Sequence, residues 1–344
     1  MPLYLLDNPY QASLKKRLTR TIWQEVFGDE EFFIKLYLEA VFRSEETLLF
    51  IDYQRERAFA HIGFPSFSFA WRSQNLQLSY ISGAATSSFY RKKGWMRKLL
   101  KTAHYRMYLH QKDLAFLVPA TRELYQFYTS VADYYPASKA RTISFQSKQA
   151  DASYSTEQYL EDLVKRKSFL SPYIYPTHTY RHWMTAIQSA ILGKGKAIVS
   201  DTFFLLVADP SLTIREKFLS FLPPAGLLPS LPDREISKPY LHGMIRIINA
   251  EKVLKKWSIL YPLKRLTFIL IDKDLFVNSG FYKVENGRVL KRQLNRKELS
   301  RYAMKMSCET NLSIPIFTPY SLADLIFPNY PFYFDLLLDP VVEK

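Results

Sequence analysis

A basic, glycine-containing segment in the first third of the chain has the residue types that hold phosphate groups. It follows an extended run that ends in small residues, and it reads Arg91, Lys92, Lys93, Gly94, Trp95 and Met96. Backbone N–H groups at the start of a helix lack intrahelical partners and attract anions, and Gly94 carries no Cβ that would keep a phosphate away. The basic side chains add charge-assisted hydrogen bonds of about 1.5–3 kcal/mol each when well formed. The segment therefore predicts an anion site.

Helices and strands must position this segment, and the apolar spacing predicts them. Apolar residues recur every four positions from Leu14 to Val26, which predicts a helix over 12–27 closed by Gly28. A second helix is expected over 30–42, and a third begins at the basic segment. The remaining expected elements are strands at 47–53, 58–64, 67–72, 76–84 and 114–118, and a helix over 121–131 capped by Thr121.

The order of these elements and the pattern Arg91-x-x-Gly94-x-Met96 resemble the GNAT N-acetyltransferases. Most members carry Gly or Ala where Met96 stands, and an apolar residue followed by Arg97 resembles the Eis-like (enhanced intracellular survival) branch. The resemblance implies acetyl-CoA as the acyl donor. It also implies that the sheet splays open between strands 76–84 and 114–118 and that the pantetheine arm lies there like an added strand. The implied donor-binding residues are Ala84, Thr86, Arg91, Lys92, Lys93, Gly94, Trp95 and Met96.

The same resemblance assigns the proton donor. Tyr125 stands four residues before Thr129, where the family pattern L-Y-x-x-x-G has its tyrosine, and it would protonate the leaving thiolate as general acid. Thr129 replaces the usual glycine. The general base stays open, because Eis-like enzymes use the terminal carboxylate and this chain ends on a charged Lys344. Acidic residues 29–31 could attract a cationic amine, although a solvated helix N-terminus capped by Asp29 is the simpler interpretation.

The resemblance covers the whole chain in three parts. Residues 1–149 are expected to form the acetyl-CoA-binding GNAT domain, and residues 150–236 a degenerate GNAT-like half without a phosphate loop. Residues 237–344 resemble a sterol-carrier-protein-like domain through the pattern Met244-x-Arg246-x-x-Asn249, followed by short strands and an Asn286-Gly287 turn. The predicted fold class is therefore α+β, with a GNAT fold, a second GNAT-like half and a sterol-carrier-protein-like domain.

Composition sets limits on this interpretation. The chain has 344 residues, 48% of them hydrophobic, which indicates two or three packed domains and excludes a disordered protein. Its net charge is +15, and residues 57–112 contain no Asp or Glu, so the positive field surrounds the basic segment. The single cysteine, Cys308, is expected to be buried and fits a reducing compartment. Without a leader-like start or a long apolar run, the chain is expected to be cytoplasmic and without a membrane span.

Three functions remain open at this stage. The first is an acetyl-CoA-dependent N-acetyltransferase acting on a primary amine of a small molecule, an aminoglycoside-like compound or a peptide lysine; relatives of this kind also form homo-oligomers. The second is a non-catalytic scaffold that binds acyl-CoA or lipid. Nucleic-acid binding ranks last, because the aromatic residues follow no RNP-like or zinc-finger pattern. No metal is expected, since His178 and His182 lack a third ligand nearby.

Overall fold

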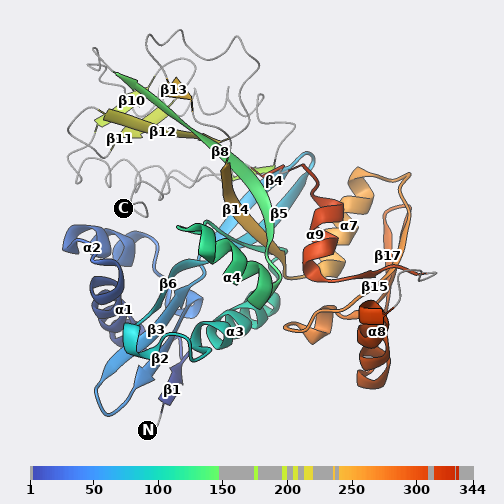
Figure 1. The fold of residues 1–344 in the computed structure, drawn as a ribbon, viewed down its shortest axis with the longest axis horizontal. Coiled ribbons are helices and arrows are strands. Elements are labelled where there is room, and N and C mark those ends of the chain that lie inside the picture. The colour runs from blue at the N-terminus through green and yellow to red at the C-terminus, as the bar shows by residue number, and fades with distance from the viewer. Residues whose placement is uncertain are drawn as a thin grey trace.

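The computed structural model describes residues 3–146, 174–176, 196–199, 204–207, 213–219, 235–236, 240–308, 314–329 and 331–332 (Figure 1). The N-terminal sheet contains, in spatial order, β1 (Leu3–Leu6), β2 (Thr47–Asp52), β3 (Arg57–Gly63) and β6 (Ser82–Thr86). Two helices, α1 (Ala12–Phe27) and α2 (Glu31–Ala40), cover one face of it with a cluster that includes Leu18, Ile22 and Trp23. Both helices, β2 and β3 were predicted within a few residues, and β6 was predicted as the end of a strand over 76–84, whereas β1 was not predicted.

A second, larger sheet runs through the centre of the molecule. Its spatial order is β12 (Thr213–Leu219), β8 (Tyr135–Gln146), β14 (Tyr240–Ile247), β7 (Leu114–Leu117), β5 (Gln74–Tyr80), β4 (Ser66–Trp71) and β9 (Ile174–Pro176), with β13 (Glu235–Ile236) beside β8. Two helices, α3 (Trp95–Leu109) and α4 (Arg122–Ala132), share a buried cluster with one face. Two helices of the C-terminal part, 250–260 and 319–326, share the cluster on the other face.

The strand predicted over 76–84 is interrupted at Ile81, and its two halves belong to different sheets. β5 runs parallel to β7, with Tyr80 opposite Phe116. The last hydrogen bond between them joins the Ile81 N–H to the Phe116 carbonyl at 2.8 Å. Beyond it the chain continues as β6, which pairs with β3 instead. The predicted splay between the two strands is therefore confirmed, and it begins at Ile81.

The C-terminal part contributes a strand to the central sheet. β14 is antiparallel to β7 on one side, with Met244 opposite Leu117, and to β8 on the other. Sequence patterns predicted this strand but gave no indication of its partners. Because β14 hydrogen-bonds to strands before residue 150, a boundary at 237 would separate paired strands. The division into 1–149, 150–236 and 237–344 stays a prediction.

The remaining elements follow the sequence expectations closely. The third sheet is β17 (Arg288–Gln293), β16 (Gly280–Glu285), β15 (Leu266–Leu270) and β18 (Ile316–Phe317), and three helices accompany it, α7 (Ala250–Leu260), α8 (Arg296–Cys308) and α9 (Pro319–Ile326). Asn286 and Gly287 both have positive φ, as the predicted tight hairpin turn requires. Apolar residues over 197–199 and 202–208 also predict a hairpin, and the structure pairs β10 (Lys196–Val199) with β11 (Phe204–Val207) in the antiparallel sense. Helices are expected over 155–193 as well; these helices, the chain end at Lys344 and the side chain of Cys308 lie outside the described residues.

One capping prediction is wrong. Asp29 does not occupy the N-cap of α2; Glu30 does, with extended backbone angles (φ −69°, ψ 146°). The Glu30 carbonyl accepts the N–H groups of Phe33 and Ile34, each at 3.1 Å, so the helix begins one residue later than the acidic run suggests. Glu31, in the first turn, pairs with Arg20 at 3.2 Å on the surface. That pairing is consistent with a solvated helix start.

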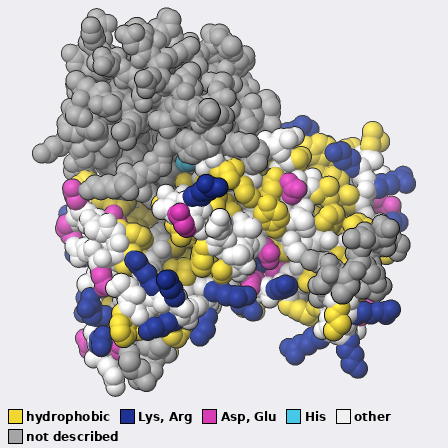
Figure 2. All heavy atoms as spheres, in the orientation of Figure 1, with side chains coloured by type: hydrophobic (Ala, Val, Ile, Leu, Met, Phe, Trp, Pro, Cys, Tyr) yellow, Lys and Arg dark blue, Asp and Glu magenta, His cyan; other side chains and the backbone are white. Residues whose placement is uncertain are grey.

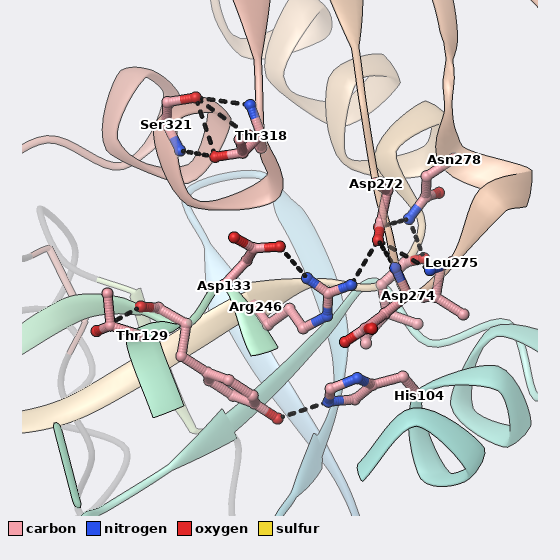
Figure 3. A network of polar contacts seen from close by, with 12 residues as sticks. His104, Thr129, Asp133, Arg246, Asp272, Asp274, Leu275, Asn278, Thr318 and Ser321 are labelled. Carbon is pink, nitrogen blue, oxygen red and sulfur yellow. Dashed lines mark hydrogen bonds and ion pairs between the residues drawn. The ribbon is translucent and has the colours of Figure 1, made fainter. Parts of the chain in front are cut away.

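A buried ionic network joins the central sheet to the C-terminal part (Figure 3). Arg246 of β14 is fully buried, and its Nη2 donates to Asp272 at 2.7 Å. The Asp133 carboxylate, which follows α4, lies 3.9 Å from the same guanidinium. Asp272 also accepts from the Leu275 N–H and the Asn278 amide. The network therefore links α4, β14 and the segment after β15, and it is fully buried at Arg246 and Asp272 while the Asp133 side chain is partly exposed.

We expect the Arg246→Met substitution to lower the free energy of unfolding by about 3–5 kcal/mol, because it leaves the Asp272 carboxylate buried without its cation. Arg20→Met is the matched control: Arg20 makes an exposed ion pair, worth about 0–1 kcal/mol. Urea denaturation of both variants measures the difference. Equal losses for the two variants would show that the buried pair is not a special source of stability.

Candidate functional site

The basic segment forms the turn that starts α3. Gly94 is the N-cap residue with φ +79°, and Lys92 also has a positive φ of +59°. The first hydrogen bond of the helix joins the Lys98 N–H to the Gly94 carbonyl at 3.2 Å, so the N–H groups of Trp95 and Met96 have no intrahelical acceptor. A Cβ built on Gly94 meets nothing within 4 Å. The segment thus offers free donors beside open space, as an anion requires.

The cations of this segment are exposed and keep their charge available. Figure 2 shows Lys and Arg side chains gathered on the lower left of the face, in the region of β6 and the start of α3. Within the described residues no carboxylate pairs with Arg91, Lys92 or Lys93, whereas Arg57 and Arg106 elsewhere in the basic stretch pair with Glu25 and Asp7. The positive field therefore concentrates at the helix start, where an anionic ligand meets no competing carboxylate.

Trp95 and Met96 act differently from the cations around them. Both are half-buried. The Trp95 ring packs edge-on against Phe50 and Phe59, with centroids 5.1 and 5.3 Å apart. These contacts anchor the first turn of α3 on β2 and β3. For these two residues only the backbone N–H groups are suited to meet an anion.

The outer edge of β6 faces the gap left by the splay. Register pairs Ala60 with Thr86, and the Ser87 N–H donates to the Phe59 carbonyl at 2.9 Å. This makes Ala60–Thr86 a non-hydrogen-bonded pair, so the N–H and C=O of Thr86 point away from β3. By alternation those of Ala84 do the same. The Thr86 carbonyl already accepts a hydrogen bond from Arg91 Nε at 3.0 Å, which connects the strand edge directly to the basic segment.

A bulge at Gly83 gives β6 its direction. Gly83 has φ +54°, and the β3–β6 register shifts between His61 and Gly63. A Cβ on Gly83 would lie 2.2 Å from the Trp23 ring, so only glycine fits. His61 Nδ1 lies 2.7 Å from the Gly83 carbonyl oxygen. An isolated glycine in a strand is a known signal for a bulge, but nothing in the sequence indicated the contact between His61 and Gly83.

Polar side chains also meet just before the bulge. The Tyr37 hydroxyl of α2 lies 3.0 Å from Ser82 Oγ, and both are buried. Burial raises the pKa of Tyr37 to about 12, so the phenol stays protonated at neutral pH. A Cβ on Gly63 would approach the same two oxygens to within 3 Å. The side chains packed behind β6 around Tyr37 and Ser82 therefore fit tightly and carry no charge.

Tyr125 lies on α4 and is half-buried. Its hydroxyl donates to the Leu241 carbonyl of β14 at 2.7 Å, at a register irregularity between Leu241 and Gly243. Thr129, which replaces the family glycine, sits within the helix, and its hydroxyl donates to the Tyr134 carbonyl at 3.2 Å. The helix continues to Ala132 and ends at Asp133 in the left-handed region. Nothing in the sequence pattern indicated that a C-terminal strand would hold Tyr125.

Other candidate residues have simpler outcomes. His178, His182 and Lys344 lie outside the described residues. Within the described ranges, no three His, Cys, Asp or Glu side chains are grouped so that they could hold a metal ion. In the same ranges, none of the helices combines the length and apolar character needed to cross a membrane.

Comparison with protein families identifies the domain that carries these features. Residues 16–129 match the family described as an acetyltransferase (GNAT) domain. The match spans both N-terminal helices, the splay, the basic segment and Tyr125. The expected GNAT domain, and with it the expected enzyme class of N-acetyltransferase, is confirmed for this part of the chain. Among curated proteins none matches the chain significantly.

Solved structures extend the likeness of fold beyond this domain. Eis1 from Mycobacterium abscessus superposes with a TM-score of 0.61 at 9% identity, covering 95% of this chain and 89% of its own. A probable N-acyltransferase from Enterococcus faecalis V583 gives 0.61 at 12% identity, and a GCN5-related N-acetyltransferase from Anabaena variabilis gives 0.58 at 13%. Each of these two covers 86% of both chains. The fold is thus a mixed α/β GNAT fold with tandem halves, as in the Eis-type structure.

We expect Gly83→Ala to destabilise the domain more than Gly28→Ala does. Both glycines have positive φ, which costs an alanine about 1–2 kcal/mol. Only at Gly83 does the added methyl overlap the Trp23 ring; at Gly28 nothing lies within 4 Å. The overlap should add about 1–3 kcal/mol to the loss in free energy of unfolding. Urea denaturation measures both losses, and equal values would contradict the close approach of Trp23 to the bulge.

Proposed function

We propose that this chain, whose residues 16–129 form an acetyltransferase (GNAT) domain, transfers an acetyl group from acetyl-CoA to a primary amine. The observation that carries the proposal is the open edge of β6. It exposes main-chain hydrogen-bonding groups at Ala84 and Thr86, and the Arg91–Thr86 bond joins it to a cationic helix start. An amide-containing chain that ends in a pyrophosphate matches this arrangement in both chemistry and order.

Each candidate residue has a role in this reaction. The loop from Arg91 to Met96 would bind the pyrophosphate through backbone N–H groups and basic side chains. Ala84 and Thr86 would pair with the pantetheine amides. At Thr86 the N–H group would be the one that binds the arm, because the carbonyl of this residue already accepts a hydrogen bond from Arg91. A backbone N–H in the segment 83–86 would polarise the thioester carbonyl. These groups hold the donor in place before any bond changes.

The transfer itself forms a bond between the amine nitrogen and the acetyl carbon and breaks the carbon–sulfur bond. The amine loses one proton to a base or to water, and the departing thiolate gains one. Tyr125 is the proposed source of that second proton, since a phenol with a usual pKa near 10 is protonated at neutral pH. To act, its hydroxyl must leave the Leu241 carbonyl, a hydrogen bond of about 0.5–1.5 kcal/mol. That cost is small beside the gain from general acid catalysis.

Several finer features belong to the same proposal. The acceptor is a primary amine on a small molecule, an aminoglycoside-like compound or a peptide, and the C-terminal part is a sterol-carrier-protein-like domain that shapes its pocket. We also propose that the chain works in the cytoplasm, as its single cysteine supports, and that copies of it can assemble. A panel of amines, peptides and aminoglycosides assayed for free-thiol release addresses the acceptor.

A second candidate function is a non-catalytic protein that binds acyl-CoA or lipid. It is favoured by the bond that holds the Tyr125 hydroxyl on Leu241, away from the role of proton donor. The two candidates separate in one experiment. Binding of acetyl-CoA by isothermal titration, with no thiol release across the amine panel, would support the second and contradict the first. If the chain binds nucleic acid with an affinity that falls steeply as the salt concentration rises, and does not bind acetyl-CoA, both candidates are contradicted.

Replacing Lys92 and Lys93 together by glutamine should weaken acetyl-CoA binding about tenfold or more, because two charge-assisted contacts are lost. Lys35→Gln, an exposed lysine on α2, is the matched charge control and should leave the dissociation constant within about twofold. Isothermal titration at two salt concentrations measures both. Equal affinities for the double variant and the wild type would remove the loop from donor binding.

Tyr125→Phe should lower kcat at least about tenfold while acetyl-CoA affinity stays nearly constant, because only the transferable proton is lost. Tyr128→Phe serves as the control on the same helix. Tyr128 is buried, and burial raises the pKa of its phenol to about 12, so its loss should leave kcat within about twofold. Steady-state thiol-release kinetics give both values. An unchanged kcat in Tyr125→Phe would exclude Tyr125 as the acid.

A further inference from the structure

A fully buried histidine contacts the bulge that directs β6. His61 lies on β3 with none of its surface exposed. Its Nδ1 atom lies 2.7 Å from the Gly83 carbonyl oxygen and 3.2 Å from Trp23 Nε1. Burial lowers the pKa of His61 to about 4, so the ring is neutral at physiological pH and carries one N–H. Which nitrogen holds that hydrogen decides what His61 does.

The two contacts of Nδ1 make opposite demands. The Gly83 carbonyl can only accept a hydrogen bond, and the Trp23 indole N–H can only donate one. A lone pair on Nδ1 would face the carbonyl lone pairs at 2.7 Å, which is a repulsive arrangement, whereas an N–H at that distance makes a short, strong bond. The hydrogen therefore belongs on Nδ1. His61 then donates to Gly83, and the longer 3.2 Å contact in which the Trp23 N–H points at Nδ1 is given up, so that Trp23 serves as the wall against the bulge.

This bond acts at the point where β6 changes direction. The backbone of His61 pairs with Ala85, and its side chain holds the carbonyl of Gly83 two residues earlier. The Gly83 carbonyl is thus turned inward, toward α1, while the groups of Ala84 and Thr86 face the open edge. Without the side-chain bond, the Gly83 peptide could rotate, and the edge donors would lose their fixed orientation.

The other ring nitrogen argues against His61 being a simple packing residue. Its Nε2 is buried and has no hydrogen-bond partner among the described residues. An apolar side chain of similar size would avoid leaving a buried acceptor unpaired. A protein that keeps an unsatisfied group in its core commonly gains function in return for the stability it gives up.

We propose that His61 is a positioning residue for acyl transfer: its Nδ1–H holds the Gly83 carbonyl and so orients the β6 edge that binds the pantetheine arm. The inference rests on the proposed function, because it assigns a purpose to that edge. It concerns the arm, because the phosphate loop lies on a different element and meets this edge only through the bond from Arg91 to the Thr86 carbonyl, three residues after Gly83. Ligands that do and do not contain the arm should therefore respond differently to changes at His61.

The test uses the full chain, two ligands and three substitutions. Coenzyme A contains the arm, and 3′,5′-ADP contains only the phosphate-bearing end. Asn can place an amide N–H near the position of Nδ1, Gln can place one near Nε2, and Leu supplies neither. We expect His61→Asn to bind both ligands within about threefold of the wild type. His61→Gln and His61→Leu should bind coenzyme A at least about tenfold more weakly and 3′,5′-ADP within about twofold.

Controls separate this role from general damage to the core. His104 is a second fully buried histidine, on α3, bonded through Nε2 to the Tyr134 hydroxyl at 3.0 Å. His104→Leu should lower the melting temperature without changing the ratio of the two affinities. Trp23→Phe removes the competing indole N–H but keeps a ring against Gly83, and should also preserve that ratio. Amide hydrogen exchange over 82–86 reports the strand directly and should accelerate in His61→Leu but not in His61→Asn.

Two results would overturn the inference. One is that the His61→Gln variant keeps its affinity for coenzyme A and the His61→Asn variant loses it, which would show that Nε2 and not Nδ1 makes the important hydrogen bond. The other is a folded His61→Leu protein with an unchanged affinity ratio and unchanged exchange over 82–86. If the wild type binds neither ligand, the proposed function fails; the exchange pattern of the Asn and Leu variants then still decides whether His61 holds the bulge.

Discussion

The structure depends on where two parallel strands stop pairing. β5 and β7 are held firmly where their pairing begins, because the Asp113 N–H donates to the Gln77 carbonyl at 2.7 Å and the Asp113 carboxylate accepts the Gln77 N–H at 2.6 Å. Lys256 of α7 adds a 2.5 Å contact to the same carboxylate. At the other end the pairing finishes with the bond from Ile81 to Phe116. A sheet closed at one end and open at the other creates an edge inside the molecule, and unpaired edge groups are what an extended ligand needs.

The open edge is held from behind by close packing. Trp23 fills the space that a side chain at Gly83 would need, and His61 holds the carbonyl of that glycine. At the start of α3 the positive charges are not neutralised. The cations at 91–93 have no carboxylate partners among the described residues, whereas Arg106, further along α3, is paired with Asp7. The tightly packed, neutral side chains behind β6 and the cationic segment at the start of α3 therefore contribute in different ways. The packed side chains hold the β6 edge in one geometry, and the basic segment attracts an anion.

The C-terminal part contributes to the site as well as to stability. β14 lies between β7 and β8 and presents the Leu241 carbonyl to Tyr125. The register of β14 shifts between Leu241 and Gly243 and again between Gly243 and Met244, and Arg246 then enters the buried network with Asp272 and Asp133. Asp133 is the C-cap of α4 and lies against Arg246 of β14 (Figure 3), while Tyr125 in the first half of the same helix bonds to Leu241 of β14. The orientation of Tyr125 therefore depends on residues more than a hundred positions later in the chain.

The sequence by itself determined the local elements and the anion loop. Helix periods, the Gly94 turn and the basic run depend on neighbours within a few residues, and such short-range preferences can be read directly. The order of elements together with the pattern Arg91-x-x-Gly94-x-Met96 predicted the GNAT fold, through its resemblance to that family. Only the tertiary structure decided that β14 enters the central sheet, that Leu241 holds Tyr125, and that His61 turns Gly83. Each of these is a contact between segments 22 to 127 residues apart, as in His61–Gly83 and Met244–Leu117. No propensity in either segment encodes such a partner, because the free energy of pairing arises only when both surfaces are buried together.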